Sequence, residues 1–175
     1  MELFDLYDCN RHPLGCTMIR GDKQPKNTYR VVVHCCIFNS QNQMLIQRRQ
    51  DFKKGWSGLW DMTCGGSPIS GESSQTAIQR ELSEELGINI DFSDNRPFLT
   101  IHFDYGFDDI YIVNKDIDLC DLSLQKEEVA EVKWANIDEI YDMIKKGIFI
   151  PYHENLMGLL FFMRNNRGTF TSNKK

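Results

Sequence analysis

The sequence predicts one domain that mixes strands and helices, an α+β (α/β) fold, and three observations support this. A β-branched and apolar run at residues 30–38 is typical of a buried strand. Apolar residues then recur every four positions at Ile78, Leu82 and Leu86, which is a helical period. The chain has 175 residues, of which 41% are hydrophobic, enough for one domain with a sizeable core. Because we find no linker and no repeat, residues 1–175 are expected to form this single domain.

The other elements are predicted from local patterns along the chain. Residues 1–30 are expected to be an N-terminal extension, in which a strand at 3–7 pairs with one near 17–20 across turn residues. Further strands are expected at residues 44–47, 61–64, 98–103, 110–113 and 129–134, and helices at 73–86, 138–145 and 154–164. The polar end of the chain, residues 165–175, is expected to fray.

Composition and charge argue against several classes of protein. The formal net charge of −5 does not favour a general nucleic-acid binder. The chain has no apolar run of about 18 residues, so no membrane helix is expected. Its acidic first residues do not resemble a signal peptide, which favours a cytoplasmic location. The six cysteines form no C-x-x-C pair and are expected to be reduced thiols.

Three glutamates on the helix predicted at residues 73–86 carry the main functional signal. Glu81, Glu84 and Glu85 stand at i, i+3 and i+4, so their side chains share one face. Like charges at this spacing weaken a helix by roughly a few tenths of a kcal/mol per pair, and a divalent cation would reverse that sign. Clustered carboxylates favour Mg²⁺ or Mn²⁺ over zinc. Three glutamates alone, however, more often form a solvated acidic face.

A longer pattern around these glutamates favours the functional interpretation. Residues 66–88 read GSPISGESSQTAIQRELSEELGI and resemble the Nudix box, G-x5-E-x7-R-E-U-x-E-E-x-G-U, in which U is aliphatic. The fixed positions are Gly66, Glu72, Arg80, Glu81, Glu84, Glu85 and Gly87, with Leu82 and Ile88 at aliphatic ones. Such a match arises by chance about once in 10⁸ starting positions. The resemblance implies a Nudix α/β/α sandwich around a mixed sheet, with the box as a loop–helix–loop.

The resemblance also implies a role for each residue of the box. Glu84 and Glu85 would be metal ligands, while Glu81 would ligate the metal, orient the attacking water or act as the base. Arg80 and Glu72 would form an ion pair that holds the loop against the helix. These five residues are the candidate catalytic set.

Positions outside the helix are expected to complete the metal site. Gly65 and Gly66 allow close backbone approach, and a glycine carbonyl often completes the metal shell in this family. One more carboxylate is expected from the acidic segment before residues 129–134, with Glu128 preferred to Glu127, although this segment could also be a solvated loop. The expected ligands of Mg²⁺ or Mn²⁺ are therefore Glu81, Glu84, Glu85 and Glu128.

Outside the box, the chain is most similar to the isopentenyl-diphosphate-isomerase-like branch of Nudix proteins. The segment FNSQNQMLIQRRQDFKKGWSGLWD carries that resemblance. The cations of this segment are candidates for contacting a diphosphate, although each could be an exposed loop cation instead. The candidate substrate-binding residues are Arg48, Arg49, Lys53, Lys54, Gly65 and Gly66.

Four departures from the isomerases of this branch indicate hydrolysis. Isomerases carry a catalytic Cys immediately before the first box glycine, where this chain has Gly65, and Cys64 lies one residue earlier. Their metal-binding His after that glycine is Ser67 here, and another His, in the strand entering the domain, is replaced by Arg30. Isomerases also degrade the R-E-U-x-E-E core, which is intact in this chain.

The sequence therefore predicts a magnesium-dependent hydrolase that cleaves a diphosphate linkage in a small molecule. The expected substrate is a nucleoside diphosphate or its X-linked derivative, and the chain would act as a monomer or homodimer. Isomerase-like activity through Cys64 is the alternative, and a non-catalytic binding module is the second. Four aromatic residues could stack a base, but we expect them to pack within the fold. They are Phe103, Tyr105, Phe107 and Tyr111.

Overall fold

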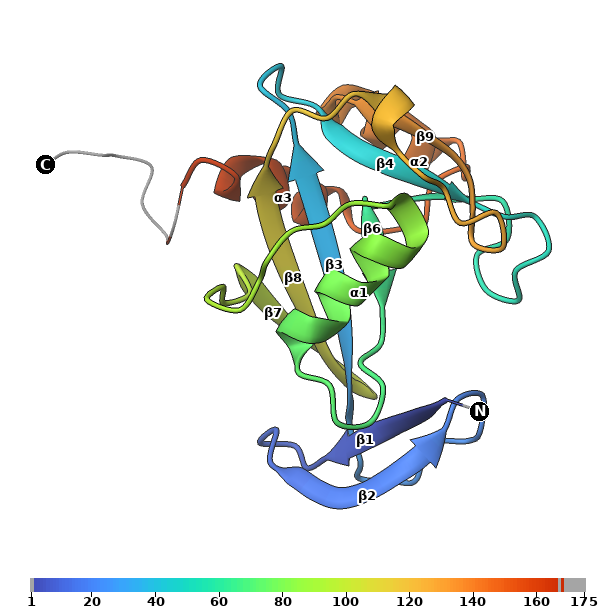
Figure 1. Cartoon of the computed structure of the whole chain (residues 1–175), viewed down its shortest axis with the longest axis vertical. Helices are drawn as coiled ribbons and strands as arrows, with labels where there is room; N and C mark the ends of the chain where they lie inside the picture. The colour runs from blue at the N-terminus through green and yellow to red at the C-terminus, as the bar shows by residue number, and fades with distance from the viewer. Residues whose placement is uncertain (1, 167, 169–175) are drawn as a thin grey trace, which may run out of the picture.

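The computed structural model describes residues 2–166 and residue 168 (Figure 1). The strands are β1 (Leu3–Tyr7), β2 (Pro13–Ile19), β3 (Arg30–Phe38), β4 (Met44–Arg49), β5 (Trp60–Asp61), β6 (Cys64–Gly66), β7 (Leu99–Phe103), β8 (Gly106–Asn114) and β9 (Val129–Ala135). The helices are α1 (Ser74–Leu86), α2 (Ile137–Lys145), α3 (Glu154–Met163) and a short 3₁₀ turn, Leu119–Asp121. Most of the predicted tail, residues 165–175, lies outside the described residues.

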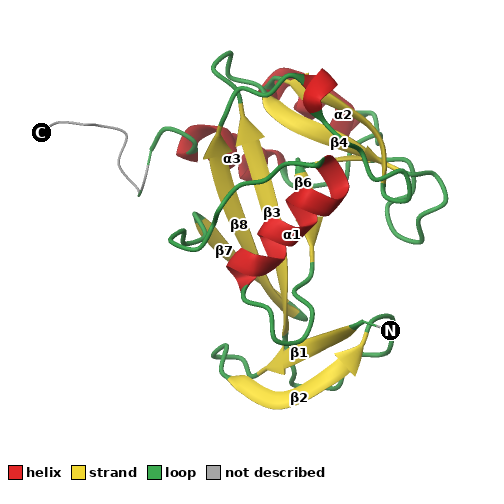
Figure 2. Cartoon of the chain, in the orientation of Figure 1, coloured by secondary structure: helices red, strands yellow, loops and turns green. Residues whose placement is uncertain are grey.

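A mixed seven-stranded sheet forms the centre of the molecule (Figure 2). Its main strand order is β5-β4-β3-β8-β7, while β6 pairs with β3 and β9 pairs with β4. The β3–β8 pair is parallel and the other pairs are antiparallel. Strand β4 pairs with the end of β3 at Phe38 and Met44, whereas β6 pairs with an earlier part of β3, residues 33–35. The sheet is therefore split between β4 and β6.

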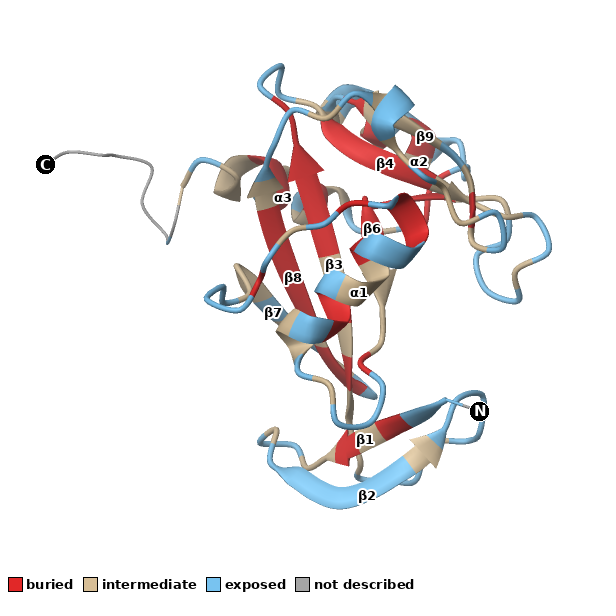
Figure 3. Ribbon diagram, in the orientation of Figure 1, coloured by how far each residue is buried: buried red, intermediate tan, exposed pale blue. Residues whose placement is uncertain are grey.

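Helices cover both faces of this sheet, which confirms the expected α/β/α sandwich (Figure 1). Side chains of a strand alternate between the two faces. On β3, Val33 and Cys35 pack in a core cluster with α1, whereas Cys36 and Phe38 belong to the cluster that includes α2 and α3. Figure 3 shows the resulting buried layer along β3 and β8. Both clusters hold the split sheet in place from opposite sides.

The predicted helix of the box forms with well-defined ends. Ser73 is the N-cap of α1, and it exchanges hydrogen bonds with Thr76 in a capping box. Gly87 ends the helix in the left-handed conformation with φ of 70°, which glycine adopts without strain. These ends determine which residues α1 presents to the sheet, so Ile78, Leu82 and Leu86 are fully buried as their spacing predicted.

One predicted element differs from the structure, because the strand expected at residues 61–64 is divided. Asp61 ends β5 beside β4, and Cys64 begins β6 beside β3. Between them, the buried Thr63 hydroxyl donates to the Leu45 carbonyl and accepts from the Ile37 amide at 2.9 Å. A side chain thus joins the two strands where the backbone ladder is interrupted. Gly65 and Gly66 also lie within β6 rather than in a loop.

The N-terminal extension forms the expected hairpin, a separate two-stranded sheet of β1 and β2. Tyr7 and Tyr29 exchange backbone hydrogen bonds, which attach the hairpin beside the start of β3. Asp5 accepts hydrogen bonds from the Ser70 hydroxyl at 2.7 Å and the Gly71 amide at 2.9 Å. The hairpin therefore holds the loop that precedes α1.

A second attachment joins the turn of this hairpin to the main sheet. The Arg11 guanidinium forms a bidentate ion pair with Asp109 of β8, whose side chain is fully buried. Burial opposes ionisation of Asp109, but hydrogen bonds from Arg11, Ser74 and Thr100 outweigh it and lower the pKa of this carboxyl. The ionised form of Asp109 is thus stabilised mainly by groups from three distant segments.

Replacing Arg11 with Met should lower the free energy of unfolding by about 1–3 kcal/mol at pH 7, because Asp109 would lose its charged partner. The Arg11 side chain is 35% exposed, so solvent moderates the loss. The loss should shrink as pH falls through the lowered pKa of Asp109. Urea denaturation measures it, with Arg96→Met as an exposed-arginine control. An unchanged stability at pH 7 would show that this ion pair does not anchor the hairpin.

Candidate active site

A cavity of about 140 Å³ collects the acidic residues of α1 together with residues from four other segments. Its lining consists of Glu2, Arg20, Arg49, Gly65, Gly66, Arg80, Glu81, Glu84, Glu85, Gln125 and Glu128. All four predicted metal-binding glutamates are in this set. The fold thus brings Glu128 to the same cavity as Glu81, which lies 47 positions earlier in the chain.

Arg80 connects the acidic residues to the preceding loop. Its Nε and Nη2 atoms donate to both carboxylate oxygens of Glu72 at 2.8 and 3.0 Å, so the predicted ion pair forms. Its Nη1 atom lies 3.0 Å from Glu81 and 3.1 Å from Glu84. Nη2 also donates to the Ser67 carbonyl at 3.3 Å. Hydrogen bonding to Glu72, followed by the nearby Glu81 charge, raises the pKa of Arg80, so it stays charged.

Glu85 is the most deeply buried of the glutamates, with an exposed fraction of 4%. Burial raises the pKa of Glu85 to about 7, and the Glu81 charge adds to this effect. Hydrogen bonds from the Gln47 amide, at 2.9 Å, and from the Cys64 thiol oppose it. Both partners come from the strands that flank the split in the sheet. The sheet therefore holds a carboxyl group where its negative charge is costly without a cation.

Because Gly65 and Gly66 have no side chains, the side chains of His34 and Glu81 pack directly against their backbone. A Cβ atom on Gly66 would lie 2.1 Å from Glu81 Oε1, and one on Gly65 would lie 2.4 Å from His34 Cδ2. The Glu81 carboxylate therefore lies against the bare backbone of β6. Burial, assisted by the Glu84 charge, raises the pKa of Glu81 against the opposing effect of Arg80. His34 is held by Asp108 at 2.7 Å, in line with a structural role.

The predicted substrate-binding cations divide into two groups. Arg49 lines the cavity, and Lys53 forms an ion pair with the lining residue Glu128. Arg48 instead pairs with Asp51 at 2.9 Å and Glu131 at 3.6 Å and is not part of the lining. Lys54 lies in the exposed loop after β4, also outside the lining. The geometry supports Arg49 most strongly, and the substrate roles of all four cations stay predictions.

Several lining or supporting residues were missed by the sequence analysis. Glu2 and Arg20 reach the cavity from the hairpin and pair with each other at 2.6 Å. Gln125 approaches from the loop before β9. Gln47 supports Glu85 from β4, and its Oε1 atom is the single buried side-chain polar atom without a partner in the described residues. Gln47 follows the apolar residues 44–46 of β4 and precedes Arg48 and Arg49, so the sequence carried no clear signal for its role.

The donor set fits a hard divalent cation, although the carboxylates do not yet form a complete ligand shell. Within residues 2–166 and 168, no three His, Cys, Asp or Glu side chains are arranged to hold a metal ion. Arg80 contacts Glu81 and Glu84, and Lys53 contacts Glu128. Because the set contains only oxygen donors and places two raised-pKa carboxyls together, it suits Mg²⁺ or Mn²⁺. The assignment of individual ligands stays a prediction.

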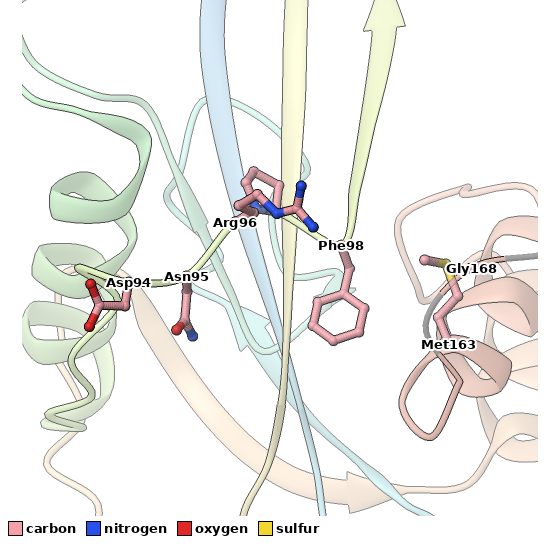
Figure 4. A pocket seen from close by; sticks show the side chains of 7 residues that line it. Asp94, Asn95, Arg96, Phe98, Met163 and Gly168 are labelled. Atoms are coloured by element: carbon pink, nitrogen blue, oxygen red, sulfur yellow. The ribbon is translucent and has the colours of Figure 1, made fainter. Parts of the chain in front are cut away.

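Another hollow, of about 240 Å³, lies between the loop before β7 and the end of α3 (Figure 4). Its lining is Asp94, Asn95, Arg96, Pro97, Phe98, Met163 and Gly168. It contains one carboxylate and none of the predicted site residues. This hollow is larger than the acidic cavity, but its lining has no group of residues suited to catalysis. The acidic cavity is therefore the candidate active site.

Comparisons with known proteins agree with this arrangement. A model of the NUDIX domain matches residues 28–153, which leaves the hairpin outside the match. An uncharacterized Nudix hydrolase of Listeria monocytogenes is 45% identical over 165 residues, which cover 94% of this chain and 96% of the relative. An isopentenyl-diphosphate Delta-isomerase of Salmonella arizonae is 32% identical over 61% of each chain. The chain belongs to the Nudix family, and it is a hydrolase of that family.

Solved structures resemble the fold as a whole. The crystal structure of DR0079 from Deinococcus radiodurans has a TM-score of 0.73 and 24% identity, covering 91% of this chain and 97% of that one. A MutT protein from Methanosarcina mazei has a TM-score of 0.58 and 18% identity, covering 79% and 96% of the two chains. These similarities concern the fold. No helix in the described part of the chain is sufficiently long and apolar to span a membrane.

Two of the positions that depart from the isomerases lie together in the structure. Arg30 Nη1 donates to Ser67 Oγ at 3.2 Å, so the two residues that replace expected histidines contact each other. Cys64 is buried, and its burial raises the pKa of the thiol well above the ordinary value. A neutral, enclosed thiol is a poor acid–base group near neutral pH. These observations favour hydrolysis over a reaction that depends on the Cys64 thiol.

A Glu85→Gln variant should be stabilised relative to the parent protein as pH rises. The pKa of Glu85 in the folded protein is about 7, above the ordinary value for glutamate. The neutral carboxyl therefore stabilises the folded state at low pH, and this stabilisation is lost as pH rises towards 7. The advantage of the variant should therefore grow by about 1–3 kcal/mol between pH 4 and pH 8. Urea denaturation in EDTA measures it, with the exposed Glu127→Gln as control. An advantage that is the same at both pH values would contradict the burial argument.

Proposed function

We propose that the chain catalyses magnesium-dependent hydrolysis of a diphosphate linkage in a small molecule. The expected substrate is a nucleoside diphosphate or its X-linked derivative. The single observation that carries this proposal is the convergence of four glutamates and Arg49 on one cavity. An acidic wall suits divalent cations, and an adjacent guanidinium suits phosphate oxygens. The family membership of the chain supports the same reaction.

The side chains have distinct parts in the proposed reaction. Glu84, Glu85, Glu81 and Glu128 would hold Mg²⁺, which neutralises phosphate charge and makes bound water more acidic. Arg49 would bind a phosphate oxygen, which orients the substrate. Water attacks phosphorus, the bridging P–O bond breaks, and two phosphorylated products leave.

In this proposal Glu81 either ligates the cation with the other glutamates, orients the attacking water or accepts its proton. Its carboxyl lies against the open backbone of Gly66 inside the acidic cavity, a position that suits all three roles. Arg80 and Glu72 are positioning residues in this proposal, since their ion pair fixes α1 against the loop. Gln47 has a similar part, because it orients Glu85 without lining the cavity.

Isomerase-like activity is the alternative, because an isopentenyl-diphosphate Delta-isomerase is among the similar proteins. It would require the Cys64 thiol to reach a substrate, and this thiol is buried and hydrogen bonded to Glu85. A non-catalytic binding module is the second alternative, and the complete set of box residues argues against it. The cytoplasmic location and the monomer or homodimer state stay predictions.

Glu84→Gln should abolish Mg²⁺-dependent turnover and leave the fold intact, because its side chain is half exposed and contributes one charge to the cation site. Purified protein would be incubated with Mg²⁺ and a panel of nucleoside diphosphates, nucleotide sugars and isopentenyl diphosphate. Mass spectrometry measures phosphate-containing products, and NMR detects a migrated double bond. Turnover that is unchanged in the variant would remove Glu84 from the site.

Cys64→Ala provides the test that separates hydrolase from isomerase. Hydrolysis should be nearly unaffected, since the thiol does not line the cavity and the Gln47 amide still holds Glu85 in the variant. The same assays measure it, and thermal unfolding checks that the variant is folded. A large loss of activity in a folded variant, together with a moved double bond in the parent protein, would favour the isomerase.

A further inference from the structure

A second pocket lies beside the acidic cavity, between the N-terminal hairpin and the main sheet. It has a volume of about 630 Å³ and is lined by Phe4, Met18, Arg20, Gly21, Asp22, Lys23, Gln24, Arg30, Ser67 and Tyr105. We call it the Arg30 pocket. Three of its side chains are cationic and one is acidic, so its lining has a positive balance within a chain of net charge −5.

Arg30 is the main feature of this pocket. Its guanidinium is partly buried, donates to Ser67 Oγ at 3.2 Å and lies 5.9 Å from the Phe103 ring centre. It forms no ion pair with any carboxylate in the described part of the chain, in contrast to Arg11 and Arg80. A partly buried cation with one neutral hydrogen-bond partner retains donors for an anion.

The electrostatic environment of Arg30 agrees with this geometry. Burial, followed by repulsion from Arg20, lowers the pKa of Arg30. Arg20 is itself paired with Glu2, so it does not add a fully free charge. An anion placed beside Arg30 would offset both the burial cost and the repulsion, because it supplies the missing opposite charge.

The Arg30 pocket adjoins the acidic cavity. Arg20 lines both hollows. Ser67 also joins them, because its hydroxyl accepts from Arg30 while its carbonyl accepts from Arg80 at 3.3 Å. A molecule that placed a diphosphate against the glutamates of α1 would therefore extend towards Arg30.

The remaining lining offers surfaces for an organic group. Phe4 and Met18 provide apolar atoms from the hairpin. Tyr105 is 62% exposed, so the expectation that it packs within the fold was wrong, whereas Phe107 and Tyr111 are buried as expected. Gln24 donates to the Tyr105 carbonyl at 2.9 Å and to the Thr28 carbonyl at 2.7 Å, which fixes the pocket wall. The exposed ring can stack on a planar or sugar group.

We propose that the Arg30 pocket binds an anionic substituent, a carboxylate or a phosphate, on the part of the substrate that lies beyond the diphosphate. Arg30 is the main contact, with Lys23 at the exposed rim. This inference rests on the proposed function for the position of the diphosphate. It narrows the substrate class to diphosphates whose organic group carries a further negative charge.

Two matched pairs of probes test the pocket and distinguish the two kinds of anion. UDP-glucuronate differs from UDP-glucose by a carboxylate, and NADP⁺ differs from NAD⁺ by a phosphate. Dissociation constants are measured by calorimetry with Ca²⁺, an oxygen-binding cation that offsets the charge of the glutamates, under conditions in which a phosphate assay detects no hydrolysis. The ratio kcat/KM is measured separately with Mg²⁺. The variants are Arg30→Gln, Arg30→Lys and the control Arg96→Gln, which removes one charge from an exposed distant position.

In at least one pair, the parent protein should bind the member with the additional carboxylate or phosphate about tenfold more tightly than the member without it. Arg30→Gln should remove this preference, Arg30→Lys should keep part of it, and Arg96→Gln should keep all of it. Circular dichroism and thermal unfolding confirm that each variant is folded. The pair that shows the preference identifies the anion as a carboxylate or a phosphate.

Other outcomes separate this inference from the proposed function. If the probes are hydrolysed but neither pair shows a preference that depends on Arg30, the pocket assignment is wrong and the hydrolase proposal stands. If the preference depends on Arg30 while no probe is hydrolysed, the pocket assignment stands and the proposed function loses support. Undetectable binding of both members that carry the additional carboxylate or phosphate would also overturn the pocket assignment.

Discussion

The structure depends on one electrostatic constraint, the burial of the Glu85 carboxyl beside Glu81. The sheet divides between β4 and β6 at this point, and residues from the two strands hold Glu85 through Gln47 and Cys64. Without a cation, burial makes ionisation of Glu85 unfavourable and raises its pKa to about 7. A divalent cation would reverse that cost. The packing of α1 therefore gives the cavity its proposed affinity for metal ions.

The N-terminal hairpin belongs to this arrangement, although it lies outside the matched family domain. Asp5 holds the loop before α1, and Arg11 reaches the buried Asp109 of β8. Because of these two attachments, Arg20 is placed at the boundary between the acidic cavity and the Arg30 pocket. The core of the family supplies the carboxylates, and the extension supplies much of the wall that a substrate would meet.

Local sequence patterns were sufficient for most of the fold, because caps and periodicity act over a few residues. The helix at residues 73–86, its glycine end and the Arg80–Glu72 pair all form as predicted. The division of the strand at 61–64 was not predictable in this way, since it depends on Thr63 bridging two strands distant in sequence. Contacts from Gln47, Arg20 and Glu2 were missed for the same reason. Charge type alone could not separate Arg49 from Arg48, which faces Asp51 and Glu131 instead.

The most direct test of the central claim is the position of a bound manganese ion in crystals grown with Mn²⁺. Anomalous diffraction locates the ion independently of any substrate. The account predicts a peak in the acidic cavity within coordination distance, about 2.0–2.4 Å, of oxygens from at least two of Glu81, Glu84 and Glu85. It also predicts that Arg80 no longer contacts the glutamates that bind the ion. A saturating Mn²⁺ concentration with no peak in the cavity, or a peak only elsewhere on the chain, would contradict it.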